Sequence, residues 1–218
     1  MPGTEGRLRR IRWTAIPVLL AAAAACTLLP GPKAVPRVTF LLRPDSPARG
    51  GPAALCPEGS GTLLVSLPRE APGFETERMA YLLRPATVKY YANSRWADSP
   101  AGMLAPAIVE ALEKTGCWRA VVRMPTTLPA DFRLDTEDLV LEQEFFSRPS
   151  KVRLALRATL VDLRAPGILA TRRFEALEDA PSEDADGGAI AAGRAAEKLL
   201  GSLAAWAHAA ARSGTASR

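Results

Sequence analysis

The alternation of apolar and polar residues along the chain predicts a sheet built from short strands. The clearest strand is expected over residues 151–163, where every second residue is apolar and the residues between are mostly basic or polar. One face of this strand is therefore buried and the other wet, which favours an antiparallel sheet. The apolar positions are Val152, Leu154, Leu156, Ala158 and Leu160.

Further strands are expected on both sides of this one. Residues 131–146 alternate with a switch of parity near Thr136–Asp138, which predicts a bulge or bend. After a tight turn at Pro166-Gly167, residues 168–174 run back and complete a three-strand meander. Shorter strands, rich in β-branched and aromatic residues, are expected at 38–42, 62–67, 79–84, 87–91 and 118–124.

Two helices accompany these strands. Ser99 is an N-cap candidate followed by Pro100 at the first helical position, and Gly116 is a C-cap candidate, so a helix is expected over residues 100–115. A second, alanine-rich helix is expected over 189–210, after an acidic loop at 177–188.

These elements predict an α+β fold: a single domain at residues 37–210, with an antiparallel-rich mixed sheet and two main helices packed on it. Residues 43–60 are crowded with proline and glycine and are expected to form a long surface loop. Residues 211–218 are expected to be a disordered tail.

The N-terminus has the composition of an export signal. Four arginines lie between residues 7 and 12, and the uncharged stretch Trp13–Ala25 precedes Cys26. Ala23–Ala25 directly before Cys26 resemble the lipobox of bacterial lipoproteins, although leucine is usual where Ala23 stands. We therefore expect a signal peptide at 1–25, lipidation of Cys26 and a tether at 26–36. An ordinary secretory signal and an uncleaved anchor are the alternative interpretations.

Most of the net positive charge of the chain lies in the predicted signal peptide. The whole sequence carries a formal net charge of +5, and residues 1–25 hold four arginines against one glutamate. The mature chain then keeps 24 basic and 22 acidic side chains, so its net charge is only +2. An exported and nearly neutral domain is not expected to bind nucleic acid.

The residues that support catalysis or metal binding are scarce. The only histidine, His208, is expected on the surface of the terminal helix, and no C-x-x-C, histidine pair or glycine-rich phosphate loop is present. The acidic residues between Glu178 and Asp186 are expected to be a solvated loop. We therefore expect a protein that is not an enzyme and binds no metal and no cofactor other than the covalent lipid on Cys26.

Two features remain open on the residues alone. Cys56 and Cys117 are left after lipidation of Cys26 and are candidates for a disulfide in an oxidising envelope. An aromatic and basic patch is a candidate protein interface, because tyrosine, tryptophan and arginine are enriched at binding hot spots. The alternative is that its tryptophan caps the core against the first helix. The patch consists of Tyr90, Tyr91, Arg95 and Trp96.

The ordered set of motifs over residues 38–207 resembles the ABC-type transport auxiliary lipoprotein family, which includes the PqiC-like outer-membrane lipoproteins. The resemblance rests on a strand that ends in tyrosines, an Arg-Trp-Ala turn before a proline-started helix, and a glycine before the next strand. The matching residues are Tyr90, Tyr91, Arg95, Trp96, Ala97, Pro100, Gly116, Trp118 and Val121.

The resemblance implies a lipid-anchored outer-membrane protein that faces the periplasm and has no catalytic residues. Thr27 and Leu28 after Cys26, with no aspartate, imply outer-membrane sorting. Such a protein serves as a docking subunit, and as a candidate homo-oligomer, beside an ATPase, a permease and an MCE-domain protein that move lipids or hydrophobic solutes. The alternatives are a stand-alone periplasmic lipid-binding lipoprotein and an envelope-assembly adaptor.

Overall fold

The computed structural model describes residues 36–44 and 61–216, and the chain divides into two units at residues 1–36 and 37–218. All helices and strands described below belong to the second unit. The predicted signal peptide, Cys26 and Cys56 lie outside the described residues. The elements are β1 (Val38–Phe40), β2 (Thr62–Val65), β3 (Arg78–Leu82), β4 (Val88–Trp96), α2 (Pro100–Lys114), β5 (Ala120–Arg123), β6 (Phe132–Glu144), β7 (Lys151–Asp162), β8 (Gly167–Asp179) and α3 (Ala185–Ala216).

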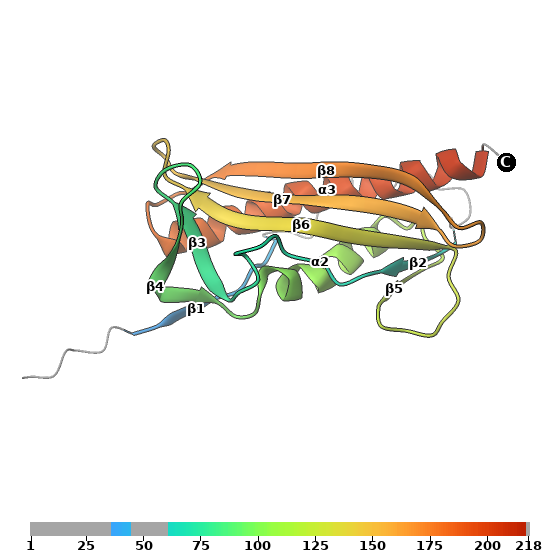
Figure 1. Cartoon of the computed structure of the whole chain (residues 1–218), viewed down its shortest axis with the longest axis horizontal. Helices are drawn as coiled ribbons and strands as arrows, with labels where there is room; N and C mark the ends of the chain where they lie inside the picture. Colours follow the sequence, from blue (N-terminus) through green and yellow to red (C-terminus); the bar gives the residue numbers. More distant parts are fainter. Residues whose placement is uncertain (1–35, 45–60, 217–218) are drawn as a thin grey trace, which may run out of the picture. The chain divides into compact units, whose positions relative to one another are not determined.

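Strand β6 organises the eight-stranded sheet (Figure 1). Along one edge it pairs with β7, which in turn pairs with β8. Its other edge is shared by two strands, because β2 pairs with residues 132–134 and β3 with residues 142–144. Strand β5 extends the sheet beyond β2, and β4 and β1 extend it beyond β3.

The predicted fold class is confirmed. The two longest ladders, β6 with β7 and β7 with β8, are antiparallel, and four shorter pairings are parallel. The expected bulge in β6 is also present, because the register with β7 shifts between Glu137 and Val140. Asp138 lies within this shift with a φ of 53°, a left-handed conformation that bends the strand.

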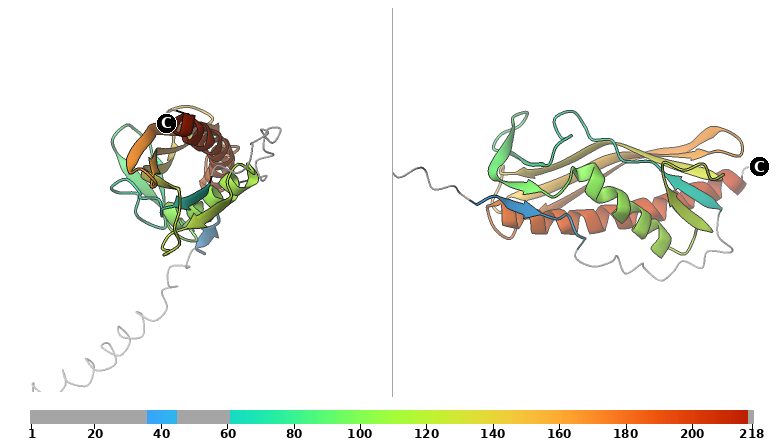
Figure 2. Two further views of the ribbon diagram at one scale, coloured as in Figure 1. Left: turned by 90° about the vertical axis from the view of Figure 1, so that its right-hand side faces the viewer. Right: turned by 90° about the horizontal axis from the view of Figure 1, so that it is seen from below.

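The helices lie together on one side of the curled sheet (Figure 2). Helix α2 begins as predicted, since the Ser99 hydroxyl accepts a hydrogen bond from the Gly102 amide at 3.2 Å and Pro100 is its first residue. Helix α3 packs on β7 and β8 and also contacts α2. The apolar faces of both helices are thus turned toward the sheet.

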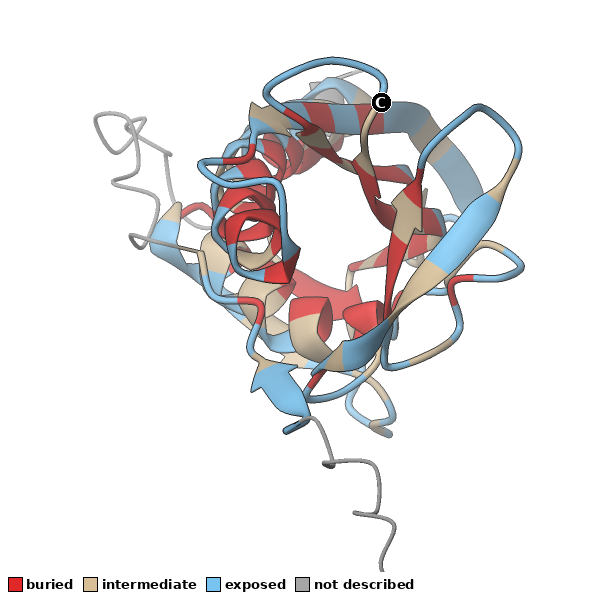
Figure 3. Cartoon of the chain, turned by 90° about the vertical axis from the view of Figure 1, so that its left-hand side faces the viewer, coloured by how far each residue is buried: buried red, intermediate tan, exposed pale blue. Residues whose placement is uncertain are grey.

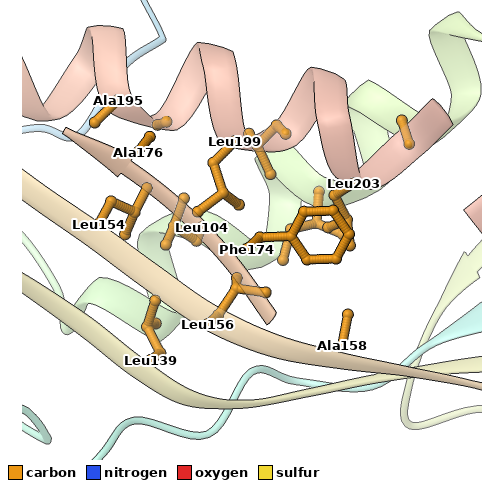
Figure 4. Close-up of a cluster of buried hydrophobic side chains, with 14 of the residues drawn as sticks. Leu104, Leu139, Leu154, Leu156, Ala158, Phe174, Ala176, Ala195, Leu199 and Leu203 are labelled. Atoms are coloured by element: carbon orange, nitrogen blue, oxygen red, sulfur yellow. The ribbon is translucent and has the colours of Figure 1, made fainter. Parts of the chain in front are cut away.

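The buried residues of the sheet and of the two helices face a common interior (Figure 3). In the close-up of Figure 4, leucines of α2, β6, β7 and α3 surround Phe174 of β8. Alanines on α3 let the helix approach the sheet closely, so large side chains of β7 fill the remaining space. Among the fully buried side chains are Leu104, Leu139, Leu154, Leu156 and Leu203.

The C-terminal third departs from the expected boundaries. Strand β8 continues to Asp179, where an acidic loop was expected from residue 177. The reason is the partner strand, because Leu177 pairs with Arg153 and Asp179 with Lys151. The Lys151 ammonium also lies 2.5 Å from the Asp179 carboxylate.

Helix α3 is longer than predicted at both ends. It begins at Ala185 instead of Ala189, where the Asp184 carboxylate accepts a hydrogen bond from the Gly187 amide at 2.9 Å. It continues to Ala216, so residues 211–216 are helical where a disordered tail was expected. Gly214 in the last turn lies against Leu169 so closely that a Cβ there would collide with it. Packing on β8 thus extends α3 past the end that its sequence predicts.

We expect Asp162→Asn to lower stability in a pH-dependent way. The Asp162 carboxylate is buried and accepts hydrogen bonds from the Arg164 guanidinium at 3.0 Å and from the Arg164 and Ala165 amides. The Arg164 side chain, followed by these amides, lowers the pKa of Asp162 to about 2. Asparagine should therefore cost about 1–3 kcal/mol at neutral pH, the usual cost of disrupting hydrogen bonds to a buried charge.

The pH dependence of the stability difference tests whether the charge of Asp162 is responsible. A carboxylate whose pKa is lower in the folded than in the unfolded state stabilises the fold. This stabilisation is complete at pH values above the unfolded-state pKa, and it is lost as the pH falls through the folded-state pKa. The difference between wild type and Asp162→Asn in denaturant unfolding should hence shrink from about pH 4 to about pH 2. A difference that stays constant over this range would show that the charge of Asp162 does not contribute.

Candidate docking surface around β4

Strand β4 carries a large bulge. Ala80 of β3 pairs with Tyr90, but Arg78, two residues earlier, pairs with Arg95, five residues later. Three extra residues of β4 are therefore accommodated between these two pairs, which bends the strand and changes which side chains face inward. The strand also continues to Trp96, whereas the sequence predicted its end at Tyr91.

The bulge divides the predicted aromatic and basic patch. Trp96 is only 3% exposed and belongs to the core, together with Ala101 and Leu104 of α2. The burial of its indole agrees with the core-packing interpretation, and Trp96 lines a small gap in the core with Met79, Leu141 and Val152. Trp96 therefore offers no surface to a partner in this conformation.

Tyr91 is half-buried and takes part in an internal polar network. Its hydroxyl donates a hydrogen bond to Oε1 of Gln143 at 2.9 Å, and Nε2 of Gln143 donates to the Ser150 hydroxyl at 2.9 Å. The ring centroid lies 4.8 Å from that of Tyr81. Burial, and then the nearby charge of Asp184, raise the pKa of Tyr91 to about 12, so the hydroxyl remains a neutral donor.

Tyr90 and Arg95 face outward. The Tyr90 hydroxyl donates to the Gly73 carbonyl at 2.6 Å, and the Arg78 guanidinium lies 4.1 Å from the Tyr90 ring centroid. The Arg95 guanidinium is half-exposed and lies 3.4 Å from the Glu77 carboxylate. The outward half of the patch is thus polar and cationic.

A cavity of about 390 Å³ lies beside the bulge. Its lining includes the three arginines Arg37, Arg78 and Arg95, which we call the arginine cluster, and the single carboxylate of Glu77. Guanidinium groups bind carboxylates and phosphates through paired hydrogen bonds, so this cavity suits an anionic partner group. The sequence analysis missed Arg37 and Arg78, because the β1–β4 pairing brings Arg37, and the β3–β4 pairing Arg78, beside Arg95.

The described residues hold no cluster of histidine, cysteine, aspartate and glutamate that could bind a metal. His208 lies within α3, but it is buried rather than at the helix surface as expected, and burial and Arg212 lower its pKa. Glu183, Asp184 and Asp186 are exposed, as expected for the acidic loop, whereas Glu178 and Asp179 lie in β8. Glu178 contacts Lys198, and Glu183 accepts a hydrogen bond from the Ser150 amide at 2.9 Å.

Cys117 is buried and disulfide-bonded. The other two cysteines of the chain, Cys26 and Cys56, lie outside the described residues. The pairing of Cys117 with Cys56 therefore stays a prediction.

Comparisons with known proteins agree with this fold. A protein of Xanthomonas campestris described as a member of the family DUF330 superposes with a TM-score of 0.72 at 21% identity, over 83% of this chain and 99% of its own. A hypothetical protein of Chlamydia trachomatis superposes with a TM-score of 0.50 at 11% identity, over 69% of this chain and 97% of its own. Both likenesses show the fold alone. No curated protein matches the chain.

The family is established by a match along the sequence. The model of the ABC-type transport auxiliary lipoprotein component matches residues 50–204, which is more than half of the chain. Within the described residues, neither helix combines the length and apolarity needed to cross a bilayer. The chain belongs to the family of ABC-type transport auxiliary lipoprotein components.

Proposed function

We propose that this protein is a non-catalytic docking subunit of an MCE-type ABC transport system that moves lipids or hydrophobic solutes between membranes. The family match over residues 50–204 carries the proposal. The charge of the domain supports docking, since the described residues offer a cationic binding surface beside β4.

The anchor is the second part of the proposal. Cys26 follows the basic and apolar N-terminal stretch and receives the acyl chains, and Thr27 and Leu28 direct the protein to the outer membrane. Each buried CH₂ group contributes about 0.8 kcal/mol to membrane binding, so two or three acyl chains hold the domain at the periplasmic face of this membrane. Residues 27–36 then connect the anchor to β1.

The packed interior favours docking over independent lipid carriage. A carrier needs an apolar cavity for its ligand. Here leucines from β6, β7, α2 and α3 meet in the centre of the described fold and fill it (Figure 4). The cavity at the arginine cluster is lined mainly by polar and charged residues, which suit a protein surface better than acyl chains.

The arginine cluster supplies the contact with the transport complex. We expect it to bind an acidic surface of the MCE-domain protein or of the permease, because complementary charges guide association and exclude other partners. Glu77 compensates only part of the positive charge of Arg78 and Arg95.

The test is recovery of partners from cross-linked envelopes with the full-length chain as bait. The wild type should recover the MCE-domain protein, the permease and the ATPase, and a double variant Arg78→Glu, Arg95→Glu should recover about tenfold less, since like charges then face the partner. Arg123→Glu on β5 is the matched control, because Arg123 is also exposed and lies outside the cluster.

Two results would contradict the proposal. Recovery of none of these partners by the wild type would remove the transport assignment. Co-purification of one phospholipid per chain in native mass spectrometry, without partners, would instead favour a stand-alone carrier.

A further inference from the structure

Two turns lie side by side at one end of the sheet. The first joins β3 to β4, where Leu82 pairs with Val88, and the second follows β6, where Glu144 pairs with the same Leu82. The Phe145 amide donates to the Leu82 carbonyl at 2.9 Å, which ties the turns together. This is the end on the left in Figure 1 and the end that faces the viewer in Figure 3.

Apolar side chains are exposed on both turns. Leu83 is 53% exposed, Val88 39% and Phe146 49%, and we call these three residues the apolar tip. Of the six phenylalanines in the chain, Phe146 alone is exposed. Single exposed apolar residues are ordinary, but a group of them on adjacent turns marks a contact surface.

The charges around the apolar tip fit a phospholipid surface. Arg84 and Arg148 are exposed in the same two turns, next to Leu83 and close to Phe146. The neighbouring β8–α3 loop also exposes Glu183 and Asp184, whose carboxylates accept hydrogen bonds from the Ser150 and Gly187 amides. Apolar residues flanked by arginines are the composition of segments that lie in the headgroup region of a bilayer.

The chain enters the domain at the same end. Strand β4 runs away from its turn, and β1 runs parallel to the last part of β4, with Val38 opposite Ser94. The chain therefore enters β1 from the side of the turn. Ten residues lie between Cys26 and Arg37, and the eleven steps from one to the other span at most about 40 Å in an extended chain.

From these observations we propose that the apolar tip inserts into the phospholipid surface that holds the acyl chains. The inference rests on the proposed anchor at Cys26. The domain is then held at two points, by the lipid and by Leu83, Val88 and Phe146. With both points engaged, the domain has a fixed orientation on the membrane.

The test uses the full-length chain, processed by its host, purified in detergent and reconstituted into vesicles of phosphatidylethanolamine and phosphatidylglycerol. Phe146→Trp reports insertion through quenching of its fluorescence by lipids brominated in the upper acyl chain. Ile168→Trp is the matched control, because Ile168 is 70% exposed in the turn at the opposite end of β7. The wild type gives the background from its own tryptophans.

We expect quenching at position 146 to exceed that at position 168 by about twofold or more, as for a side chain within the headgroup and upper acyl region. Adding Leu83→Asp to Phe146→Trp should abolish most of this difference. Because both positions are exposed, neither change is expected to prevent folding, and unfolding curves provide the check.

The other outcomes separate the tip from the anchor. If mass spectrometry verifies acylation and quenching is equal at positions 146 and 168, the proposed insertion of the apolar tip is overturned. The proposed anchor at Cys26 then remains. A chain without acyl groups overturns the anchor and this inference with it. A concentration-dependent blue shift at position 146 without quenching would show that a second copy covers the tip, which also overturns the inference.

Discussion

Trp96→Ala is expected to lower the free energy of unfolding by about 3–5 kcal/mol, the usual cost of replacing a large buried aromatic side chain by alanine. The indole of Trp96 is 3% exposed and belongs to the same core cluster as Leu104 of α2. Its removal leaves a cavity beside Met79 of β3 and Leu141 of β6, which the surrounding strands cannot close without moving. Denaturant unfolding followed by circular dichroism measures the loss.

Two further variants make this result specific. Trp96→Phe keeps most of the apolar volume and should cost clearly less than alanine. Tyr90→Ala, on the outward side of the same strand, should change stability by about 1 kcal/mol, since it removes one exposed hydrogen bond to Gly73. If Trp96→Ala left stability unchanged but abolished partner recovery, Trp96 would belong to the interface instead of the core.

The elements that the sequence predicted well are those with strong local signals. Helix α2 has a hydroxyl cap at Ser99 and proline at Pro100, and its predicted range agrees with the structure to within one residue. Strand β7 alternates from Val152 to Leu160 apart from Ala155, so both its position and its buried face could be predicted. Here neighbouring residues alone determine the conformation.

The features that escaped prediction depend on pairing between distant residues. Residues 177–179 read as an acidic loop, but the register with β7 makes them strand. Likewise, the length of α3 depends on the contact of Gly214 with Leu169, which has no local sequence signal.

The candidate docking surface shows the same limit. Arg95 could be selected from its aromatic neighbours, but the arginine cluster exists because the β4 bulge sets Arg95 opposite Arg78 and β1 brings Arg37 beside them. The bulge also explains why Trp96, adjacent to Arg95 in sequence, is buried. Proximity along the chain therefore predicted the residue types of the site but not their division between surface and core.

The predicted partner of Cys117 leads to the second large effect. The chain has three cysteines, and an acylated Cys26 leaves Cys56 as the sole partner for the disulfide-bonded Cys117. A bridge between them closes a loop of 62 residues, counting both cysteines. In the chain-entropy model such a loop restricts the unfolded state enough to contribute about 4 kcal/mol.

We therefore expect Cys117→Ser to lower the unfolding free energy by about 4 kcal/mol under oxidising conditions. Cys56→Ser removes the same bridge without altering the buried position 117, so it should cost nearly as much, and the double variant should cost little more than either single variant. Under reducing conditions the wild type should fall to the level of Cys56→Ser. If instead Cys117→Ser were destabilising while Cys56→Ser had no effect, Cys56 would not be the partner, and Cys26 would carry a disulfide in place of lipid.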